Sequence, residues 1–488
     1  MKNLTNKNLL KSQCLVGLAG DGWLDAIEQA VIAVTNPFNG EKIGEVPSLS
    51  KEQVLEAVAS AHAVQAEWAS KTAADRSQLL MKWADLIDEN QEDLAILMTA
   101  EQGKPLKESR GEIGYANSFI RWFAEEGKRV YGDTIPATNK AQRIVVLKQP
   151  VGVCAAITPW NFPAAMITRK VAPALAAGCT MIVKPATETP LSALALGELA
   201  MQAGIPKGVL QIVTGKSAVV GDVLTGDERI HKLSFTGSTE VGRTLMAQCA
   251  KTIKKLSLEL GGNAPFIIFE DANLDKAADG LIAAKYRNAG QTCVCANRIY
   301  VHESIKADFL AIFEQKVAAL NVGNGLDEAT DIGPLINQKA MEKVSELINK
   351  AVAQGAKLIA GGDTNPASDL TLNPTILSDV SDDMAIASAE IFGPVTTVFT
   401  FTEEAEVIRK ANDTIYGLAA YFYTQDLSRS WRVSEALEYG MVGQNTGLIS
   451  TAVAPFGGVK QSGFGREGSK YGIEEYVTTK YWCQDISE

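Results

Sequence analysis

One cysteine and one glutamate stand out as a pair that could carry covalent chemistry. Cys293 lies in the segment NAGQTCVC (288–295), and Glu259 opens the segment ELGGN (259–263). The chain has only 3 histidines, so a thiol nucleophile here needs a different base. A carboxylate can fill that role, and the combination suits the oxidation of an aldehyde through a thioester.

The elements that must position these residues change in character along the chain. In the first third, Ser50 and Gln53 form a capping-box helix start, and apolar residues then recur at spacings of three and four as far as Trp68. Further helical segments follow and end near Gly103-Lys104-Pro105. This region therefore predicts a helical layer.

From about Arg143 the pattern alternates between strands and helices. Strands are predicted over 144–147, 151–157, 181–183, 209–213 and 232–235, with helices such as 191–203 and 240–250 between them. This alternation is typical of βαβ units in a parallel sheet, and a second α/β stretch runs from about Pro265 to Thr446. The predicted fold class is α/β.

Several segments have residue types that bind phosphate. The best candidate is FTGSTEVG (235–242), where a strand ends and a helix begins, although an ordinary helix cap has the same pattern. Lys184, at a strand end, is by itself a common solvated lysine. GFGREG (463–468) follows a turn rather than a strand, and GKS (215–217) lacks the first glycine of a P-loop, so neither predicts a nucleotide site.

Composition excludes several classes of protein. A chain of 488 residues with a net charge of -11 is a large acidic globule of about two to four domains, for which nucleic-acid binding is not expected. Pro159, Asn161 and Pro163 interrupt the longest apolar stretch, 151–167, so no membrane span is expected. The first 7 residues show no targeting signal, and the 7 cysteines are odd in number and scattered, which favours a cytoplasmic protein with reduced thiols. No His or Cys cluster has metal-ligand spacing.

Taken together, the motifs resemble the NAD(P)-dependent aldehyde dehydrogenase superfamily. They occur in the family's order along essentially the whole chain: PWNFP (159–163), KP (184–185), FTGS (235–238), ELGG (259–262), GQTC (290–293) and EIFGP (390–394). Three longer segments are similar to succinate-semialdehyde dehydrogenases: MITRK (166–170), RNAGQTCVCANR (287–298) and APFGGVKQSG (454–463).

The resemblance implies a set of catalytic roles. Cys293 attacks the aldehyde, the Asn161 amide and the Cys293 backbone N–H stabilise the resulting oxyanion, and Glu259 activates the water that hydrolyses the thioester. Glu259 has apolar neighbours, so its pKa is expected to be raised. Lys170 and Glu467 form a supporting polar relay in the family, and a structural ion pair is the alternative for these two.

The same resemblance implies the cofactor site and its preference. The residues assigned to the dinucleotide are Thr158, Trp160, Lys184, Thr187, Gly237, Ser238, Leu260, Glu390 and Phe392. NAD-preferring relatives commonly carry glutamate where this chain has Thr187, and that carboxylate repels a 2′-phosphate. We therefore expect NADP to be preferred, or both NADP and NAD to be used, although the adjacent Glu188 could partly restore the repulsion.

Substrate identity is expected from three matched positions. Arg169, Arg287 and Ser450 correspond to residues that hold the substrate carboxylate in succinate-semialdehyde dehydrogenases, and guanidinium groups bind carboxylates by forked hydrogen bonds. Oxidation of succinate semialdehyde is the predicted activity. Glutarate semialdehyde or another short aldehyde acid, and a non-catalytic scaffold protein, remain the alternatives. A thiol hydrolase is disfavoured because the three histidines lie outside the motifs.

The resemblance also implies regulation and assembly. Cys295 lies two residues beyond Cys293, and a reversible disulfide between them is one hypothesis, with simple packing of Cys295 as the other. The family architecture combines a Rossmann-like cofactor domain (1–130 and 150–260), an α/β catalytic domain (261–460) and a small β extension (131–149 and 475–488). Since that extension binds a neighbouring subunit in the family, a homodimer or homotetramer is expected.

Overall fold

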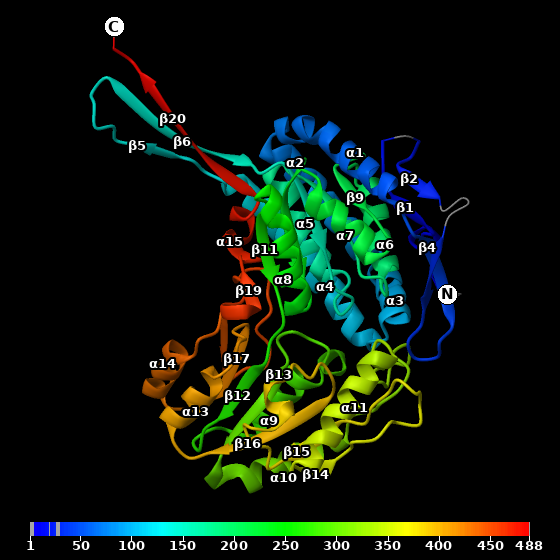
Figure 1. The fold of residues 1–488 in the computed structure, drawn as a ribbon, viewed down its shortest axis with the longest axis vertical. Helices are drawn as coiled ribbons and strands as arrows, with labels where there is room; N and C mark the ends of the chain where they lie inside the picture. Colours follow the sequence, from blue (N-terminus) through cyan, green and yellow to red (C-terminus); the bar gives the residue numbers. More distant parts are fainter. Residues whose placement is uncertain (1–3, 19, 26–29, 488) are drawn as a thin grey trace.

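The computed structural model describes residues 4–18, 20–25 and 30–487. The expectation that the chain has no targeting signal rests partly on residues 1–3, which lie outside the described residues. The chain forms two lobes, each built around a large sheet, and an arm that projects away from them (Figure 1). We call these the upper lobe, the lower lobe and the arm. A separate two-stranded ribbon pairs β3 (Val31–Thr35) with β4 (Lys42–Pro47).

The upper lobe contains the predicted helical layer. Ser50 caps the first helix by accepting a hydrogen bond from the Gln53 N–H, and the Gln53 side chain returns the contact, so the predicted capping box is confirmed. The helices here are α1 (Lys51–Ser70), α2 (Ala73–Glu89), α3 (Gln91–Gln102), α4 (Leu106–Glu126), α5 (Ala165–Ala177), α6 (Pro190–Gln202), α7 (Ser217–Gly226), α8 (Thr239–Cys249) and α15 (Ser469–Glu474).

The sheet of the upper lobe has the strand order β19-β11-β10-β7-β8-β9-β1-β2. Its members are β1 (Gln13–Leu15), β2 (Trp23–Asp25), β7 (Val153–Ile157), β8 (Thr180–Lys184), β9 (Leu210–Ile212), β10 (Ile230–Thr236), β11 (Lys255–Glu259) and β19 (Gly463–Phe464). The five central strands are parallel, as the alternation predicted. Their carboxyl ends therefore meet at one edge, where open α/β sheets bind ligands.

One predicted strand belongs elsewhere. Residues 144–147 were assigned to the parallel sheet, but they lie in β6 (Gln142–Pro150), which pairs antiparallel with β5 (Asp133–Ile135) and β20 (Val477–Asp485) in the arm. Only residues 151–152 separate β6 from β7, and that link is too short for the crossover that parallel neighbours need. The assignment to the parallel sheet was wrong for this reason.

The lower lobe contains the second α/β stretch. Its sheet has the order β14-β15-β16-β13-β12-β17-β18. The strands are β12 (Ala264–Ile268), β13 (Ala296–His302), β14 (Lys357–Ala360), β15 (Thr375–Ser378), β16 (Val395–Phe401), β17 (Ala419–Tyr423) and β18 (Met441–Gln444), and the helices are α9 (Leu274–Lys285), α10 (Lys306–Ala318), α11 (Gln338–Ala353), α12 (Ala385–Ser388), α13 (Glu404–Asn412) and α14 (Leu427–Ala436).

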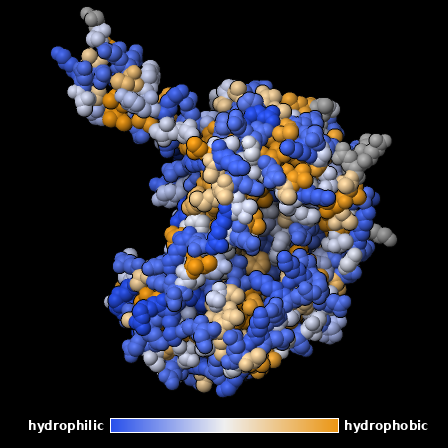
Figure 2. All heavy atoms as spheres, in the orientation of Figure 1, coloured by the Kyte–Doolittle hydropathy of each residue, from blue (hydrophilic) through white to orange (hydrophobic). Residues whose placement is uncertain are grey.

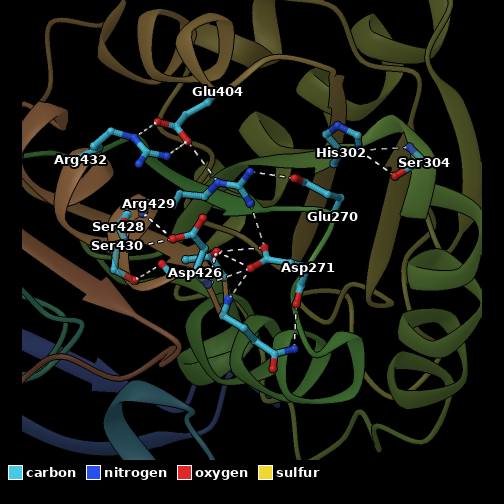
Figure 3. Close-up of polar contacts among 12 residues, drawn as sticks. Glu270, Asp271, His302, Ser304, Glu404, Asp426, Ser428, Arg429, Ser430 and Arg432 are labelled. Atoms are coloured by element: carbon cyan, nitrogen blue, oxygen red, sulfur yellow. Dashed lines mark hydrogen bonds and ion pairs between the residues drawn. The ribbon is translucent and has the colours of Figure 1, made fainter.

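A polar cluster joins the helices of the lower lobe to its sheet. The Arg429 guanidinium contacts Glu270 at 2.7 Å, Asp271 at 2.9 Å and Glu404 at 3.1 Å (Figure 3). It also lies over the Phe269 ring, 4.5 Å from the ring centroid. Since Phe269 and Glu270 follow β12 directly, this one side chain fixes α13 and α14 to the end of a central strand. The cluster is a structural ion-pair network.

The face of the two lobes seen in Figure 2 is largely polar, with small apolar areas scattered over it. On the arm, Tyr481 and Trp482 of β20 are 63% and 51% exposed, which is unusual for large aromatic side chains in a monomer. Among the residues that the structure describes, no helix is both long enough and apolar enough to cross a bilayer.

Candidate active site

A cavity of about 480 Å³ lies where the carboxyl edge of the upper sheet faces the lower lobe. It brings together eight of the residues predicted from the sequence: Trp160, Asn161, Gly237, Ser238, Leu260, Cys293, Glu390 and Phe392. They come from the segment after β7, the β10–α8 turn, the end of β11, the cysteine loop and the segment before β16. We call this space the first cavity.

The β10–α8 turn gives the first cavity a helix N-terminus. Ser238 is the N-cap of α8, and its hydroxyl accepts a hydrogen bond from the Val241 N–H at 3.4 Å. The capping role that was weighed against a phosphate site is therefore present, and Gly237 and Ser238 at this helix start also line the cavity, where a helix N-terminus favours an anion. Trp160 and Phe392 meet edge to face across the cavity, with ring centroids 5.7 Å apart.

Glu390 is fixed at the side of this cavity by backbone contacts. Its Oε1 accepts a hydrogen bond from the Gly262 N–H at 2.8 Å, and burial raises the pKa of its carboxyl group. A Cβ on Gly261 would lie 2.9 Å from the Glu390 carboxylate, so only glycine leaves this wall open. Lys343 donates to the Glu390 backbone carbonyl at 2.7 Å. The donors, the aromatic rings and the open backbone wall fit a dinucleotide.

Three of the predicted cofactor residues lie outside the first cavity. Thr158 is buried next to Lys184, and its N–H donates to the Lys184 carbonyl at 3.1 Å. The Lys184 ammonium is buried as well, which lowers its pKa, with Glu188 opposing that shift. Thr187 is exposed and lines a separate, smaller cavity together with Glu101 and Glu188.

The cysteine loop has an unusual backbone. Asn288, Ala289 and Gly290 have φ angles of 52°, 53° and 73°, so three consecutive residues are left-handed just before Cys293. A Cβ on Gly290 would lie 2.1 Å from the Gly393 carbonyl, so only glycine permits this close approach. Two consecutive non-glycine residues in this conformation require support from the surrounding structure.

That support comes through Asn161 and its neighbours. The Asn288 Nδ2 donates to the backbone carbonyls of Asn161 at 2.9 Å and Gln291 at 3.2 Å. The Asn161 carbonyl also accepts from the Lys104 Nζ at 2.7 Å, and Lys104 is paired with Glu112 at 2.5 Å. These contacts tie Asn161 to the loop that carries Cys293.

A second cavity begins on the other side of the same thiol. Cys293 lines it together with all three predicted substrate residues, Arg169, Arg287 and Ser450. Arg169 lies over the Phe456 ring at 4.3 Å, and Arg287 lies over the Phe162 ring at 5.2 Å. Among the residues that the structure describes, Cys293 alone lines both the first and the second cavity.

The relay residues form a buried ion cluster. Glu467 contacts both the Arg169 guanidinium and the Lys170 ammonium, and the Lys170 Nζ also donates to the Thr236 hydroxyl at 2.7 Å. Burial lowers the pKa of Lys170. Arg169 thus has a partner within the protein, so its position in an apolar helix does not by itself require a ligand.

Glu259 ends strand β11 behind the thiol and lines neither cavity. Its carboxylate is buried, and both oxygens lack a hydrogen-bond partner within the described chain. Burial, and then the nearby Glu467, hold the pKa of Glu259 well above its usual range, while Arg169 and Lys170 oppose that shift. The predicted rise in pKa is confirmed in direction.

The two thiols of the cysteine loop differ in access. Cys293 is partly accessible, whereas Cys295 is 3% exposed and directs its Sγ toward the Lys285 carbonyl at 3.6 Å. Burial raises the pKa of the Cys293 thiol to about 12, with Arg169 and then Arg287 acting in the opposite direction. Both cysteines are free thiols in this structure.

The remaining sequence candidates lie away from the thiol. His62 lies in α1, and His231 lies in β10, where its ring contacts the Val151 carbonyl. His302 is the last residue of β13, and its ring contacts Ser304 and Thr402. The GFGREG segment forms the edge strand β19 and a turn rather than a dinucleotide loop.

Sequence reasoning missed several residues that line the two cavities. Lys339 and Lys343 enter the first cavity from α11, and Tyr115, Met166 and Phe456 line the second. Tyr115 lies in α4, beyond Gly103-Lys104-Pro105, where the predicted helical segments end, so no sequence signal indicated it. Phe162, Met166 and Phe456 lie in recognised motifs, and those motifs were the available signal for them.

Comparisons with known proteins agree with this geometry. The profile of the Aldehyde dehydrogenase family matches residues 23–482. The chain is 57% identical to the succinate-semialdehyde dehydrogenase (NADP(+)) GabD of Escherichia coli K12, over 98% of this chain and 99% of that protein. It is 60% identical to a glutarate-semialdehyde dehydrogenase of Pseudomonas putida, over 95% and 96%. A crystal structure of an aldehyde dehydrogenase from Brucella melitensis biovar abortus superposes with a TM-score of 0.98 at 62% identity, covering 100% of both chains. The chain belongs to the aldehyde dehydrogenase family.

Proposed function

We propose that the protein oxidises succinate semialdehyde to succinate, with NADP(+) as the preferred oxidant. The observation that carries this proposal is the position of Cys293, whose thiol lies between a cavity that fits a dinucleotide and a cavity that contains two arginines. An aldehyde with an anionic end would enter from the arginine side and present its carbonyl carbon to the thiol.

The first chemical step forms a carbon–sulfur bond. The Cys293 thiol gives up its proton to solvent water, the sulfur attacks the aldehyde carbon, and the electron pair of the carbonyl bond moves to the oxygen, which becomes an alkoxide. The Asn161 amide and the Cys293 backbone N–H would donate to that oxygen. Because burial disfavours the thiolate, Arg169 and Arg287 assist this step by their positive charge.

The second stage breaks the carbon–hydrogen bond and then the carbon–sulfur bond. A bound nicotinamide dinucleotide supplies the acceptor for the hydride, and Cys293 is left as a thioester. Glu259 takes a proton from water, the hydroxide adds to the thioester carbon, and the acid and the free thiol are released. The raised pKa of Glu259 makes its carboxylate a stronger base than an ordinary glutamate.

The NADP preference rests on Thr187 and Lys184. Thr187 itself adds no carboxylate beside Lys184, so the ammonium has only the charge of Glu188 opposing its attraction of a 2′-phosphate. The relative from Escherichia coli carries NADP(+) in its name, which supports the same assignment.

The choice of succinate semialdehyde is the finer part of the proposal. The relatives are named for either succinate or glutarate semialdehyde, which differ by one methylene. We expect kcat/KM with NADP(+) to be highest for succinate semialdehyde, then for glutarate semialdehyde, and far lower for butanal. If kcat/KM is highest for glutarate semialdehyde, that compound replaces succinate semialdehyde as the proposed substrate. If kcat/KM is highest for butanal, the proposal that the enzyme prefers aldehydes with an anionic end is overturned.

The proposal extends to domain division and assembly. Residues 1–130 and 150–260 would bind the cofactor, 261–460 would supply the thiol, and 131–149 with 475–488 would bind a neighbouring subunit. The exposed Tyr481 and Trp482 on the arm support an assembly into a homodimer or homotetramer. Light scattering of the wild type and of Trp482→Glu tests this, and a monomeric wild type would contradict it.

A further inference from the structure

The hydroxyl group of Tyr115 is a donor that finds no acceptor among the residues that the structure describes. The residue lies in α4, and its ring packs edge to face on Phe119 with centroids 4.9 Å apart. Its hydroxyl oxygen is buried beside the Arg169 guanidinium, which can only donate, and the hydroxyl proton has no acceptor within the described chain. An unpaired buried hydroxyl is destabilising, and a phenylalanine would fill the same space without that cost.

The hydroxyl belongs to a group of unpartnered donors around one cavity. Tyr115 lines the second cavity with Cys293, Arg169 and Arg287. The Arg169 Nη2 and the Arg287 Nε are also buried without hydrogen-bond acceptors. The three residues come from α4, α5 and the turn before the cysteine loop, so separate elements converge on the same space. Three donors without acceptors fit an anionic ligand.

The surroundings also favour the hydroxyl as a donor. Burial raises the pKa of Tyr115, although the neighbouring Arg169 and Arg287 act against that shift. The phenol therefore keeps its proton near neutral pH and can donate it in a hydrogen bond, and two flanking guanidinium groups would hold an anion within its reach.

We propose that Tyr115 is a substrate-binding residue whose hydroxyl donates a hydrogen bond to the anionic end group of the aldehyde. This inference rests on the proposed function, because it requires an aldehyde with a negative charge at the end remote from the carbonyl. Tyr115 then contributes to specificity: it distinguishes an anionic from a neutral end group and has no part in the attack by Cys293.

Tyr115→Phe removes only the hydroxyl and tests this role. We expect the KM for succinate semialdehyde to rise roughly 10- to 100-fold, because the variant loses one hydrogen bond to a charged group. The value of kcat should change less than about threefold. The KM for butanal should stay the same. The melting temperature should change little, because the proton of the hydroxyl has no acceptor among the described residues of the free protein.

Two comparison variants make the outcome decisive. Tyr439→Phe removes a hydroxyl that is bonded to Arg298 at 2.9 Å in the lower lobe, and it should change neither KM. Arg287→Ala should raise the KM for succinate semialdehyde alone. If Arg287→Ala has this effect but Tyr115→Phe shifts neither KM or both equally, the role of Tyr115 is overturned and the proposed function stands. If the wild type itself shows no preference for the anionic aldehyde, both are overturned.

Discussion

Asn161 donates its side-chain Nδ2 to the backbone carbonyl of Gln291 across 3.0 Å, two residues before Cys293. The backbone carbonyl of Asn161 accepts hydrogen bonds from the side chains of Lys104 and Asn288. Both the backbone and the side chain of Asn161 are therefore bonded to the cysteine loop. The amide is therefore positioned before substrate arrives, and stabilisation of a developing oxyanion would need little rearrangement.

Replacement of Asn161 by alanine should therefore affect the chemical step. We expect kcat to fall by about 10²- to 10³-fold, the usual loss for one oxyanion donor, while the Kd for NADP(+) is unchanged. Steady-state kinetics and a dinucleotide titration measure the two quantities. Asn273→Ala is the control, because it removes a helix cap at α9 and should lower stability by about 1 kcal/mol without changing kcat. An Asn161→Ala enzyme with full kcat would contradict the assignment.

The rate of thioester hydrolysis should fall at acid pH as the Glu259 carboxylate becomes protonated. The carboxylate must be ionised to accept a proton from water, so thioester hydrolysis should increase as the pH rises through a pKa well above that of a free glutamate. Glu467→Gln removes a neighbouring negative charge, so the acid limb should move to lower pH. Single-turnover hydrolysis of the acylated enzyme across pH measures this. A limb that moves to higher pH in Glu467→Gln would exclude Glu259 as the titrating base.

Thr187 should set the cofactor preference. Thr187→Glu places a carboxylate where the 2′-phosphate is expected, so kcat/KM for NADP(+) should fall by at least about tenfold, equivalent to about 1.4 kcal/mol of repulsion. The value for NAD(+) should be unchanged or higher. Thr187→Gln has nearly the same size without the charge and should keep the preference of the wild type. Equal effects of the two variants would mean that charge at this position does not matter.

Oxidation tests the hypothesis of a disulfide between Cys293 and Cys295. Hydrogen peroxide would take two electrons and two protons from the two thiols to give a disulfide and two waters. We expect dithiothreitol to restore activity to the oxidised wild type, whereas Cys295→Ala should be inactivated irreversibly because its Cys293 has no nearby thiol to protect it. Cys249→Ala is a matched control, and it should behave as the wild type does. Equal recovery in the wild type and Cys295→Ala would support simple packing of Cys295.

The sequence was informative where local chemistry determines structure. The capping box at Ser50 and the parallel strands follow from local patterns in the chain, and the apolar neighbours of Glu259 indicated the direction of its pKa shift, although part of the shift comes from the distant Glu467. It was uninformative where distant elements meet. Tyr115 and Lys343 reach the cavities from helices α4 and α11, which no sequence pattern had linked to the site, and the ion pair between Arg169 and Glu467 joins residues 298 positions apart. The strand over 144–147 was recognisable, but its partner β20 lies at the other end of the chain.

The most direct test of the account is the covalent state of Cys293 during turnover. Glu259→Gln should still form the thioester but hydrolyse it slowly, so mixing it with NADP(+) and succinate semialdehyde should give a rapid burst of about one NADPH per active site. Peptide mass spectrometry after quenching should then find a succinyl group on Cys293. Full turnover by Glu259→Gln, or a burst without an adduct on Cys293, would contradict the proposed mechanism.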